Sequence, residues 1–446
     1  MSPDADVEQG RADHGLVALR EQGSACDNLA EAAPVSLRYQ RQAWSVLIAS
    51  TLAFTVSFMV WMVFGVIAIP IGRELQLSAT EVGVMMGVPI LAGSLVRLPL
   101  GLWTDRGAGR HLTLWLLGLT VPALLLLAQA RVYWQILLAG ALIGLAGGVF
   151  AVGTPYVARW FPRAQQGMAM GVFGSGNAGA ALNQMVAPVL LVAFGWTRVP
   201  QLYAVMVLIT LLVFWLMSEP GRAPTNRAPM SWRQQLQLLR EPRVLRYCQY
   251  YSVVFGGFVA LALWLVQHYV GEYGLNIRNA ALLAVLFTLP GGLMRGLGGA
   301  LADRYGAHSV TWWVMWVSWI CLFVLSYPQT DFTIRTETGI LSLHIGLSVE
   351  VFSAVAMVLG VAWSFGRASV FKYISEDYPE DIGAVTGVVS MVGGLGGFAL
   401  PILFGMLLDA TGIRSSAFML LYGWVWLSLI WMYWTEMRRI DVVQRP

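Results

Sequence analysis

Residues 97–106 read Arg-Leu-Pro-Leu-Gly-Leu-Trp-Thr-Asp-Arg, and residues 295–304 read Arg-Gly-Leu-Gly-Gly-Ala-Leu-Ala-Asp-Arg. The two stretches start 198 residues apart, and each has Arg at its first position and Gly-x-x-x-Asp-Arg at its end. Each also closes a long apolar segment. A repeat at this distance in a chain of 446 residues predicts two structurally related halves.

The composition indicates that both halves lie in a membrane. Hydrophobic residues make up 57% of the chain and charged residues only 12%, about half the charged fraction of a soluble protein. This excludes soluble, fibrous, disordered and nucleic-acid-binding classes. A membrane-spanning helix needs about 20 mostly apolar residues. Twelve such stretches occur, at approximately 44–71, 83–103, 112–130, 133–157, 167–194, 199–217, 247–270, 279–301, 309–327, 346–366, 383–408 and 415–435.

The segment between the sixth and seventh spans is rich in Arg, Pro and Gln and divides the spans six and six. We therefore predict an all-α membrane protein with two pseudo-symmetric six-helix bundles, a plan typical of transporters that bind substrate near the midplane between the halves. The predicted parts are an N-terminal tail (1–43), a first bundle (44–217), a linker (218–246), a second bundle (247–437) and a C-terminal tail (438–446).

The distribution of basic residues predicts the orientation. With both termini inside, twenty of the 28 Lys and Arg residues fall in inner segments and six in outer loops. Because positive loops stay in the cytoplasm, both termini and the linker are expected there. Residues 1–43 lack the apolar segment of a signal peptide, and the arginine-rich, nearly lysine-free composition is typical of a GC-rich bacterial genome. The expected location is a bacterial inner membrane.

Arg97 and Arg295 lie inside spans, each eight residues before the Asp at the inner edge. Eight residues of helix measure about 12 Å, which places both near the middle of a core about 30 Å thick. Each buried arginine costs about 2.5 to 3.5 kcal/mol on insertion scales. All nearby Asp and Glu residues lie at span edges, so we expect an anionic substrate to supply the missing negative charge. The alternatives are pairing with carbonyls or hydroxyls, and snorkelling.

Guanidinium groups narrow the substrate class. Their planar donor fork matches carboxylate-like and trigonal oxyanions, such as nitrate and nitrite. Formate and oxalate remain an alternative. The absence of a mid-span carboxylate disfavours amines, sugars coupled through carboxylates, and zwitterionic amino acids.

Two spans carry runs of glycine, which predict close helix packing and little cavity volume beside them. The residues are Gly167, Gly171, Gly174, Gly176 and Gly179 in the fifth span, and Gly393, Gly394, Gly396 and Gly397 in the eleventh. Residues 174–179 also match the GxGxxG pattern of dinucleotide binding, but that pattern requires a preceding strand. We therefore expect no cofactor. The open alternatives are packing and direct approach of backbone and the Asn177 amide to the anion.

The twelve spans, the central loop and the repeated Gly-x-x-x-Asp-Arg motif resemble the major facilitator superfamily over residues 40 to 437. The paired glycine runs and in-span arginines resemble its nitrate/nitrite porters. The resemblance implies that Asn177 is the signature asparagine and that aromatic residues hold a flat anion between the arginines. It also implies a cytoplasmic gate, with simple helix capping as the alternative. The aromatic residues are Phe150, Tyr251 and Phe255, and the gate residues are Asp105, Arg106, Asp303 and Arg304.

Few groups are available for coupling to protons. The five histidines fall in tails, loops or span ends, and a proton symporter generally needs a titratable group within the membrane. This favours nitrate/nitrite exchange, although the resemblance also allows nitrate/proton symport. Arg367 and Lys372 are expected at the inner end of the tenth span, where they could recruit anions or simply follow the positive-inside rule.

The three cysteines lie far apart, and no cluster of Cys and His has the spacing of metal ligands. We expect no metal and no enzymatic activity. The expected partners are a small inorganic anion and the lipid bilayer, with no nucleic acid, and the expected state is a monomer. A membrane-embedded sensor or enzyme on a transporter fold is the alternative of another class.

Overall fold

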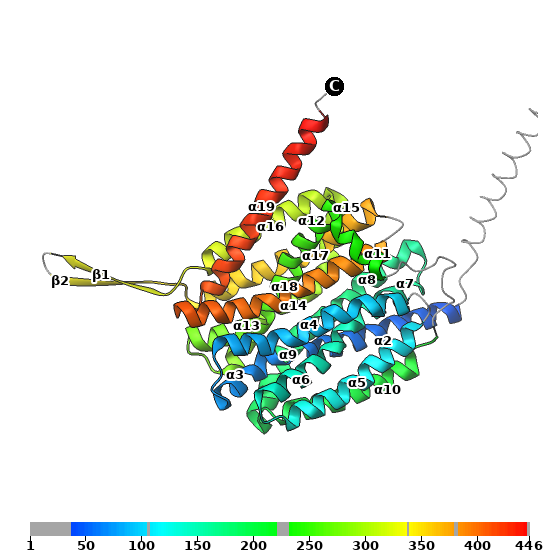
Figure 1. Ribbon diagram of the computed structural model, residues 1–446, viewed down its shortest axis with the longest axis horizontal. Coiled ribbons are helices and arrows are strands. Elements are labelled where there is room, and N and C mark those ends of the chain that lie inside the picture. The colour runs from blue at the N-terminus through cyan, green and yellow to red at the C-terminus, as the bar shows by residue number, and fades with distance from the viewer. Residues whose placement is uncertain (1–36, 105–107, 221–231, 337–338, 379–381, 444–446) are drawn as a thin grey trace, which may run out of the picture. The chain divides into compact units, whose positions relative to one another are not determined.

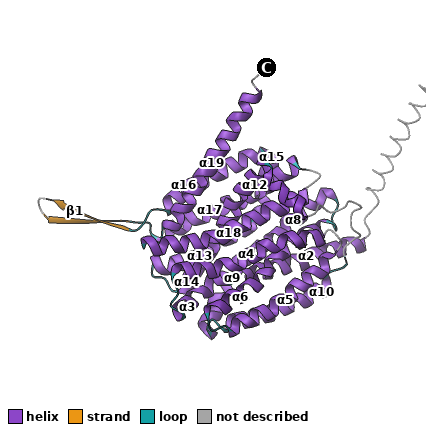
Figure 2. Ribbon diagram, viewed as in Figure 1, coloured by secondary structure: helices purple, strands orange, loops and turns teal. Residues whose placement is uncertain are grey.

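The computed structural model describes residues 37–104, 108–220, 232–336, 339–378 and 382–443. The chain divides into two units, residues 1–44 and 45–446, and the packing below concerns the second unit. The predicted N-terminal tail lies mostly outside the described residues. Within the described residues, the second unit consists of helices and one β-hairpin (Figures 1 and 2).

The first half contains six spans, two of which are interrupted at glycines by single 3-10 turns. Helices α2 and α3 together form the first span. The elements are α2 (Leu37–Trp61), α3 (Phe64–Glu74), α4 (Ala79–Trp103), α5 (Gly109–Gln129), α6 (Tyr133–Gly144), a 3-10 turn (Leu145–Gly148), α7 (Val149–Ala158), α8 (Arg163–Gly174), a 3-10 turn (Ser175–Ala178), α9 (Gly179–Phe194) and α10 (Arg198–Met217).

The second half repeats this plan, and a π-helical turn interrupts its first span. The elements are α11 (Trp232–Gln237), a 3-10 turn (Leu238–Arg240), α12 (Pro242–Tyr251), the π-helical turn (Ser252–Gly256), α13 (Gly257–Glu272), α14 (Ile277–Leu293), α15 (Arg295–Tyr305), α16 (Ala307–Leu325), β1 (Thr330–Thr336), β2 (Gly339–Ile345), α17 (Val349–Asp377), α18 (Ile382–Thr411) and α19 (Ser416–Val443).

Among the described residues, eleven helices are long and apolar enough to cross a membrane, and twelve when α14 and α15 count as one bent span. The twelve predicted spans are therefore confirmed. The bend of 49° between α14 and α15 follows Pro290, Gly291 and Gly292. Proline removes a helical hydrogen-bond donor and glycine is a poor helix former, so the chain kinks there.

The structure differs from the sequence prediction at several boundaries. The first helix begins at Leu37 rather than 44, and α19 continues to Val443, past the predicted end of the second bundle at 437. The predicted linker 218–246 is not only loop, because α11 and the start of α12 lie within it. An antiparallel hairpin, which pairs Thr330 with Ile345 and Thr336 with Gly339, lies between the predicted spans 309–327 and 346–366.

We call the end of the bundle that carries this hairpin the hairpin end, and the opposite end, where α10 ends and α12 begins, the linker end. The two halves are in close contact toward the hairpin end, where α4 packs along α18 (Figure 1). A Cβ on Gly83 would overlap the Pro401 carbonyl, and one on Gly405 would overlap Ala79. Glycine at these positions therefore lets the two helices approach backbone to backbone.

A second contact between the halves is polar. The Thr288 hydroxyl of α14 donates to Gln184 Oε1 of α9 at 2.6 Å, and Gln184 Nε2 donates to the Ala262 carbonyl of α13 at 3.0 Å. Both side chains are buried, so these hydrogen bonds join the halves in a water-poor setting.

Candidate functional site

Arg97 lies on α4, and only 3% of it is exposed. Its Nη1 donates to the Ser390 carbonyl of α18 at 3.0 Å, and its Nε donates to the Gly147 carbonyl at 3.4 Å. The guanidinium carbon lies 5.4 Å from the ring centres of Trp61 and Phe255. Arg97 is thus held by carbonyls and aromatic faces from both halves of the chain.

Gly394, in the glycine run of the eleventh span, explains how α18 comes this close to α4. A Cβ on Gly394 would overlap the Ser94 hydroxyl and lie 3.8 Å from Arg97 Nη1. Any larger residue at 394 would push α18 away from α4. The glycine therefore allows the Ser390 carbonyl to reach the arginine.

Arg295 is the first residue of α15 and follows directly on the bend that ends α14. Its guanidinium carbon lies 4.6 Å from the Phe371 ring centre and 5.8 Å from that of Phe150. Among the described residues, nothing hydrogen bonds to its side chain. A Cβ on Gly174 would lie 3.5 Å from Arg295 Cδ, so this glycine makes room for the arginine.

The Phe150 ring lies beside both arginines, because its centre is 5.9 Å from the Arg97 guanidinium carbon and 5.8 Å from that of Arg295. The two guanidinium carbons are therefore no more than about 12 Å apart. The structure brings the two arginines predicted from sequence to one place, one from each half.

No carboxylate within the described part of the chain pairs with either arginine. The ion pairs there join Lys372 to Asp303 and Glu376, and His344 to Asp331. Arg97 is partly satisfied by carbonyls, as one alternative anticipated, whereas Arg295 has no such partner among these residues. The positive charge at the centre thus lacks a neutralising side chain in the described chain.

Arg367 corrects the sequence analysis, which placed it at the inner end of the tenth span. Helix α17 continues to Asp377, so Arg367 lies ten residues before its end and is fully buried. Its Nε donates to the Trp363 carbonyl at 3.3 Å, Nη2 donates to the Gly291 carbonyl, and the group stacks on Phe258 at 4.2 Å. Nη1 is buried without a partner. The central region thus contains a third arginine.

Three aromatic rings connect these arginines. Tyr251 stacks on Phe255 with ring centres 5.1 Å apart, and Phe371 meets Tyr251 edge-on at 5.2 Å. Phe255 faces Arg97, and Phe371 faces Arg295. Tyr251 and Phe255 were predicted from the sequence, whereas Trp61 and Phe371 were not, because nothing distinguishes these two in a chain rich in aromatic residues.

Asn177 lies in the 3-10 turn between α8 and α9, and 3% of it is exposed. Its Nδ2 donates to the Gly174 carbonyl of its own segment at 2.8 Å. The turn packs against α14, where a Cβ on Gly292 would lie 2.7 Å from the Ala178 nitrogen. The structure records no hydrogen bond from Asn177 to the arginines, and the amide serves the local turn.

The glycine runs have two roles. Six of the glycines face backbone or side chains that a Cβ would crowd, as close packing predicts; they are Gly176, Gly179, Gly393, Gly394, Gly396 and Gly397. Gly167 and Gly171 have open space beside them and line a cavity of about 810 Å³ that contains Arg295 and Phe150. The expectation of little cavity volume is therefore wrong at this point.

This cavity extends from Phe150 and Arg295 to exposed residues at the linker end. Lys372 lines it and pairs with Asp303 at 2.8 Å and with Glu376 at 3.5 Å. Asp303 thus joins α15 to α17 within one half, and Arg304 stacks over Tyr305 at 5.3 Å. The other two predicted gate residues, Asp105 and Arg106, lie outside the described residues.

Comparison with known proteins agrees with this architecture. The pattern of the Major Facilitator Superfamily matches residues 49–401. The chain is 38% identical over 413 residues to a probable nitrate/nitrite antiporter, NarK1, of Thermus thermophilus, covering 89% of this chain and 92% of the relative. It is 28% identical over 390 residues to the nitrite extrusion protein of Bacillus subtilis (strain 168), covering 86% and 93%.

Among solved structures, the fold resembles a bacterial homologue of the human lysosomal transporter Spinster in an inward-facing and occupied conformation. The TM-score is 0.67 at 13% identity, over 88% of this chain and 96% of the other. This likeness concerns the fold alone. From the matched superfamily pattern and the extent of its relatives, the chain belongs to the Major Facilitator Superfamily and, within it, to the nitrate/nitrite porter family.

Proposed function

We propose that this protein is a secondary active transporter that exchanges nitrate and nitrite across the bacterial inner membrane by alternating access. The observation that carries the proposal is the pair formed by Arg97 and Arg295. Their guanidinium groups come from different halves, share the Phe150 ring, and pair with no carboxylate among the described residues. A small anion between them supplies the missing charge.

The surroundings suit a flat anion. Phe255 lies against Arg97, and Phe150 and Phe371 line the cavity that contains Arg295, so aromatic rings lie beside both arginines. A planar anion stacks on such rings while its oxygens accept from the planar guanidinium fork. We expect a tetrahedral anion to stack on these rings less well than a planar one.

The arrangement of the halves supports alternating access. They are in contact toward the hairpin end, and the cavity beside Arg295 extends to the linker end. With the linker and both termini in the cytoplasm, as the basic residues indicate, this conformation is open inward. Rocking of one bundle against the other exposes the same arginines on the opposite side.

Electrostatics favours exchange over one-way transport. Three buried arginines make an empty carrier costly, at roughly 2.5 to 3.5 kcal/mol for each charge near the bilayer centre. A bound anion lowers this cost in each direction of movement. The empty carrier therefore reorients slowly, and the return of a second anion completes the cycle.

Proton symport is the competing form of coupling, and one buried histidine supports it. His268 of α13 is 3% exposed, and its Nδ1 has no partner among the described residues. It stacks on Phe352 at 4.9 Å. His268 lies near the end of a predicted span, but its burial makes it the histidine to test for coupling.

The first experiment measures anion-dependent thermal stabilisation of the purified protein in detergent. Nitrate and nitrite should raise Tm, and Arg295→Lys should lose most of this response, because lysine keeps the charge but not the donor fork. An unchanged nitrate response in Arg295→Lys would remove Arg295 from the site. Stabilisation by formate or oxalate without any response to nitrate would instead select the small-carboxylate carrier.

The second experiment uses vesicles loaded with nitrite and given external nitrate, with and without a pH gradient. Exchange predicts uptake that requires internal nitrite and is indifferent to the gradient. Uptake that needs the gradient, and that His268→Gln abolishes, would establish symport in place of exchange.

A further inference from the structure

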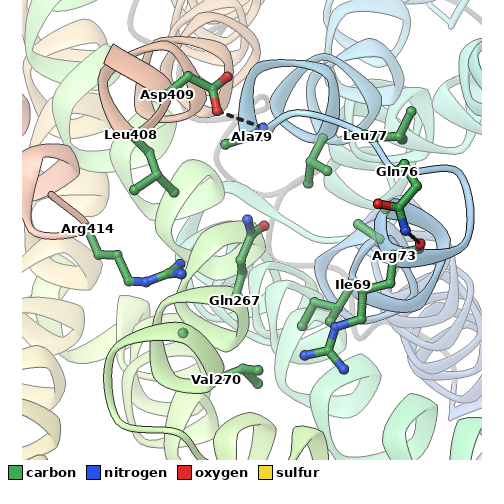
Figure 3. Close-up of a pocket in the computed structure, with 14 residues that line it drawn as sticks. Ile69, Arg73, Gln76, Leu77, Ala79, Gln267, Val270, Leu408, Asp409 and Arg414 are labelled. Carbon is green, nitrogen blue, oxygen red and sulfur yellow. Dashed lines mark hydrogen bonds between the residues drawn. The ribbon is translucent and has the colours of Figure 1, made fainter. Parts of the chain in front are cut away.

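A second cavity, of about 480 Å³, lies at the hairpin end (Figure 3). Both halves line it: the segment from the end of α3 to the start of α4 belongs to the first half, and α13, α18 and the turn after α18 belong to the second. It shares no lining residue with the cavity beside Arg295. It therefore lies apart from the central arginines, at the other end of the bundle.

Two arginines, one from each half, face this cavity. Arg73 lies in the last turn of α3, and Arg414 lies in the turn between α18 and α19. Figure 3 shows their side chains reaching toward the cavity on opposite sides of Gln267. The Arg414 guanidinium lies so close to Gly271 that a Cβ there would overlap it. Glycine at 271 thus leaves the space that this guanidinium occupies.

Neither guanidinium has a hydrogen bond or an ion pair with any residue that the structure describes. The one acidic residue that lines the cavity, Asp409, is already engaged. Its carboxylate accepts from the Ala79 nitrogen at 3.0 Å, and from the Thr80 nitrogen at 2.8 Å and hydroxyl at 2.5 Å. The cavity therefore carries two positive charges and a carboxylate whose oxygens serve the start of α4.

Gln267 also lines the cavity, and its side chain is half-buried. Its Oε1 is buried without a hydrogen-bond partner, and its Nε2 donates to nothing in the described chain. The free Nε2 can donate to an anion in the cavity, whereas Oε1 only accepts hydrogen bonds and offers nothing to an anion. An amide and two guanidinium groups around one small cavity form a set of donors that suits a small oxyanion.

We propose that this cavity is a second anion-binding site, which captures the transported class of small planar oxyanion at the hairpin end before the halves open there. The choice of anion rests on the proposed function; the site itself rests on Arg73, Arg414 and Gln267. Packing of α4 against α18, with Asp409 bound to the start of α4, separates the site from the centre in this conformation. Separation of those helices joins the two sites.

Such a site acts mainly on the rate of capture. A cleft lined by one sign of charge raises the local anion concentration and the association rate by about 10- to 1,000-fold in favourable cases, and salt screens the effect. Because Arg73 is exposed and Arg414 is half-buried, we expect the lower part of that range. Removing both should raise KM and leave kcat unchanged.

The test uses the double variant Arg73→Gln/Arg414→Gln of the full chain in oriented vesicles, with nitrate added at the hairpin side. At low ionic strength, set with sodium gluconate, we expect a three- to tenfold higher KM than for the unmodified protein, and the difference should vanish at high salt. Arg131→Gln is the control, because Arg131 is exposed at the same end but does not line the cavity. Its KM should stay unchanged.

An unchanged KM in the double variant at low salt would overturn the proposal, as would an equal effect in Arg131→Gln. Arg73→Gln alone, at an exposed position, provides a milder second variant with the same expected direction. Nitrate binding is also titrated with the Arg295→Lys variant, first alone and then combined with Arg73→Gln and Arg414→Gln. This comparison separates binding at the second anion-binding site from binding at the central arginines. If Arg295→Lys still binds nitrate weakly, and Arg73→Gln/Arg414→Gln removes that binding, the second anion site is supported even if the protein transports another anion. If only the proposed function is wrong, this weak binding of nitrate remains.

Discussion

Arg367 offers the sharpest test of how positive charge is used at the centre of this transporter, because two physical roles predict opposite results. In the first role, Arg367 only stabilises the end of α14. It donates to the Gly291 carbonyl, which belongs to the last turn of α14, where carbonyls lack helical partners. In the second role it adds to the positive potential that binds the anion.

The structure sets the size of the second effect. Phe371 lies one helical turn after Arg367 on α17, and its ring centre is 4.6 Å from the Arg295 guanidinium carbon. Residues one turn apart have Cβ atoms about 5 to 6 Å from one another, and we therefore take roughly 10 Å as the order of the distance between the charge of Arg367 and an anion at Arg295. At an effective dielectric constant of about 20, this interaction is worth about 1.7 kcal/mol.

The perturbation is Arg367→Met, which keeps an unbranched apolar side chain beside Phe258 and removes the charge. From about 1.7 kcal/mol we expect nitrate to bind roughly 15- to 20-fold more weakly. The anion-free protein should lose little stability. The lost hydrogen bond to Gly291 costs about 1.5 to 3 kcal/mol, but removing a buried, unneutralised cation offsets it.

The assay is nitrate titration by thermal shift or by calorimetry on purified protein, with Tm recorded before nitrate is added. Arg278→Met is the control, because Arg278 is exposed at the start of α14. The reasoning is refuted if Arg367→Met lowers Tm in the absence of anion and leaves the nitrate Kd unchanged. That outcome would mean that Arg367 stabilises the bend between α14 and α15 and does not contribute to anion binding.

Two further substitutions test the contacts that join the halves. Gly394→Ala should destabilise the protein by about 1 to 3 kcal/mol in thermal unfolding, because the added methyl group would overlap the Ser94 hydroxyl. Gly387→Ala on the same helix is the control. No atom lies within 4 Å of a Cβ at this position, so this variant should be neutral or slightly stabilising. Asp409→Ala removes the acceptor from the start of α4 and should favour opening at the hairpin end, seen as faster labelling of a cysteine introduced beside the contact. Labelling at the unmodified rate would assign the closure to helix packing alone.

Much of the fold follows from the order of residues along the chain. Spans are set by the length of apolar segments, and the repeat of Arg97 and Arg295 with their Asp-Arg endings marked two related halves. A buried charge in a span is costly wherever the helix packs, so these two arginines could be recognised without coordinates. The bend of α14 was missed, although Pro290 and the two glycines after it are its local cause.

Arg367 shows the limit of that reasoning. It follows an apolar segment directly and precedes Lys372, so by hydropathy it belongs to a cytoplasmic helix end. Its burial is decided by neighbours from other helices, Gly291 of α14 and Phe258 of α13, which cover it. The selection of Trp61 and Phe371 among many aromatics has the same origin.

The order of residues along the chain is enough to show that it spans a membrane in two matching halves and carries two charges inside its spans, because transfer of apolar and charged groups between water and lipid depends on local composition. The tertiary structure alone decided that Phe150 joins those charges, that a third arginine lies beside them, and that Asp409 meets Ala79 from 330 residues away. Such meetings depend on how helices pack, and packing is settled by side chains distant in sequence.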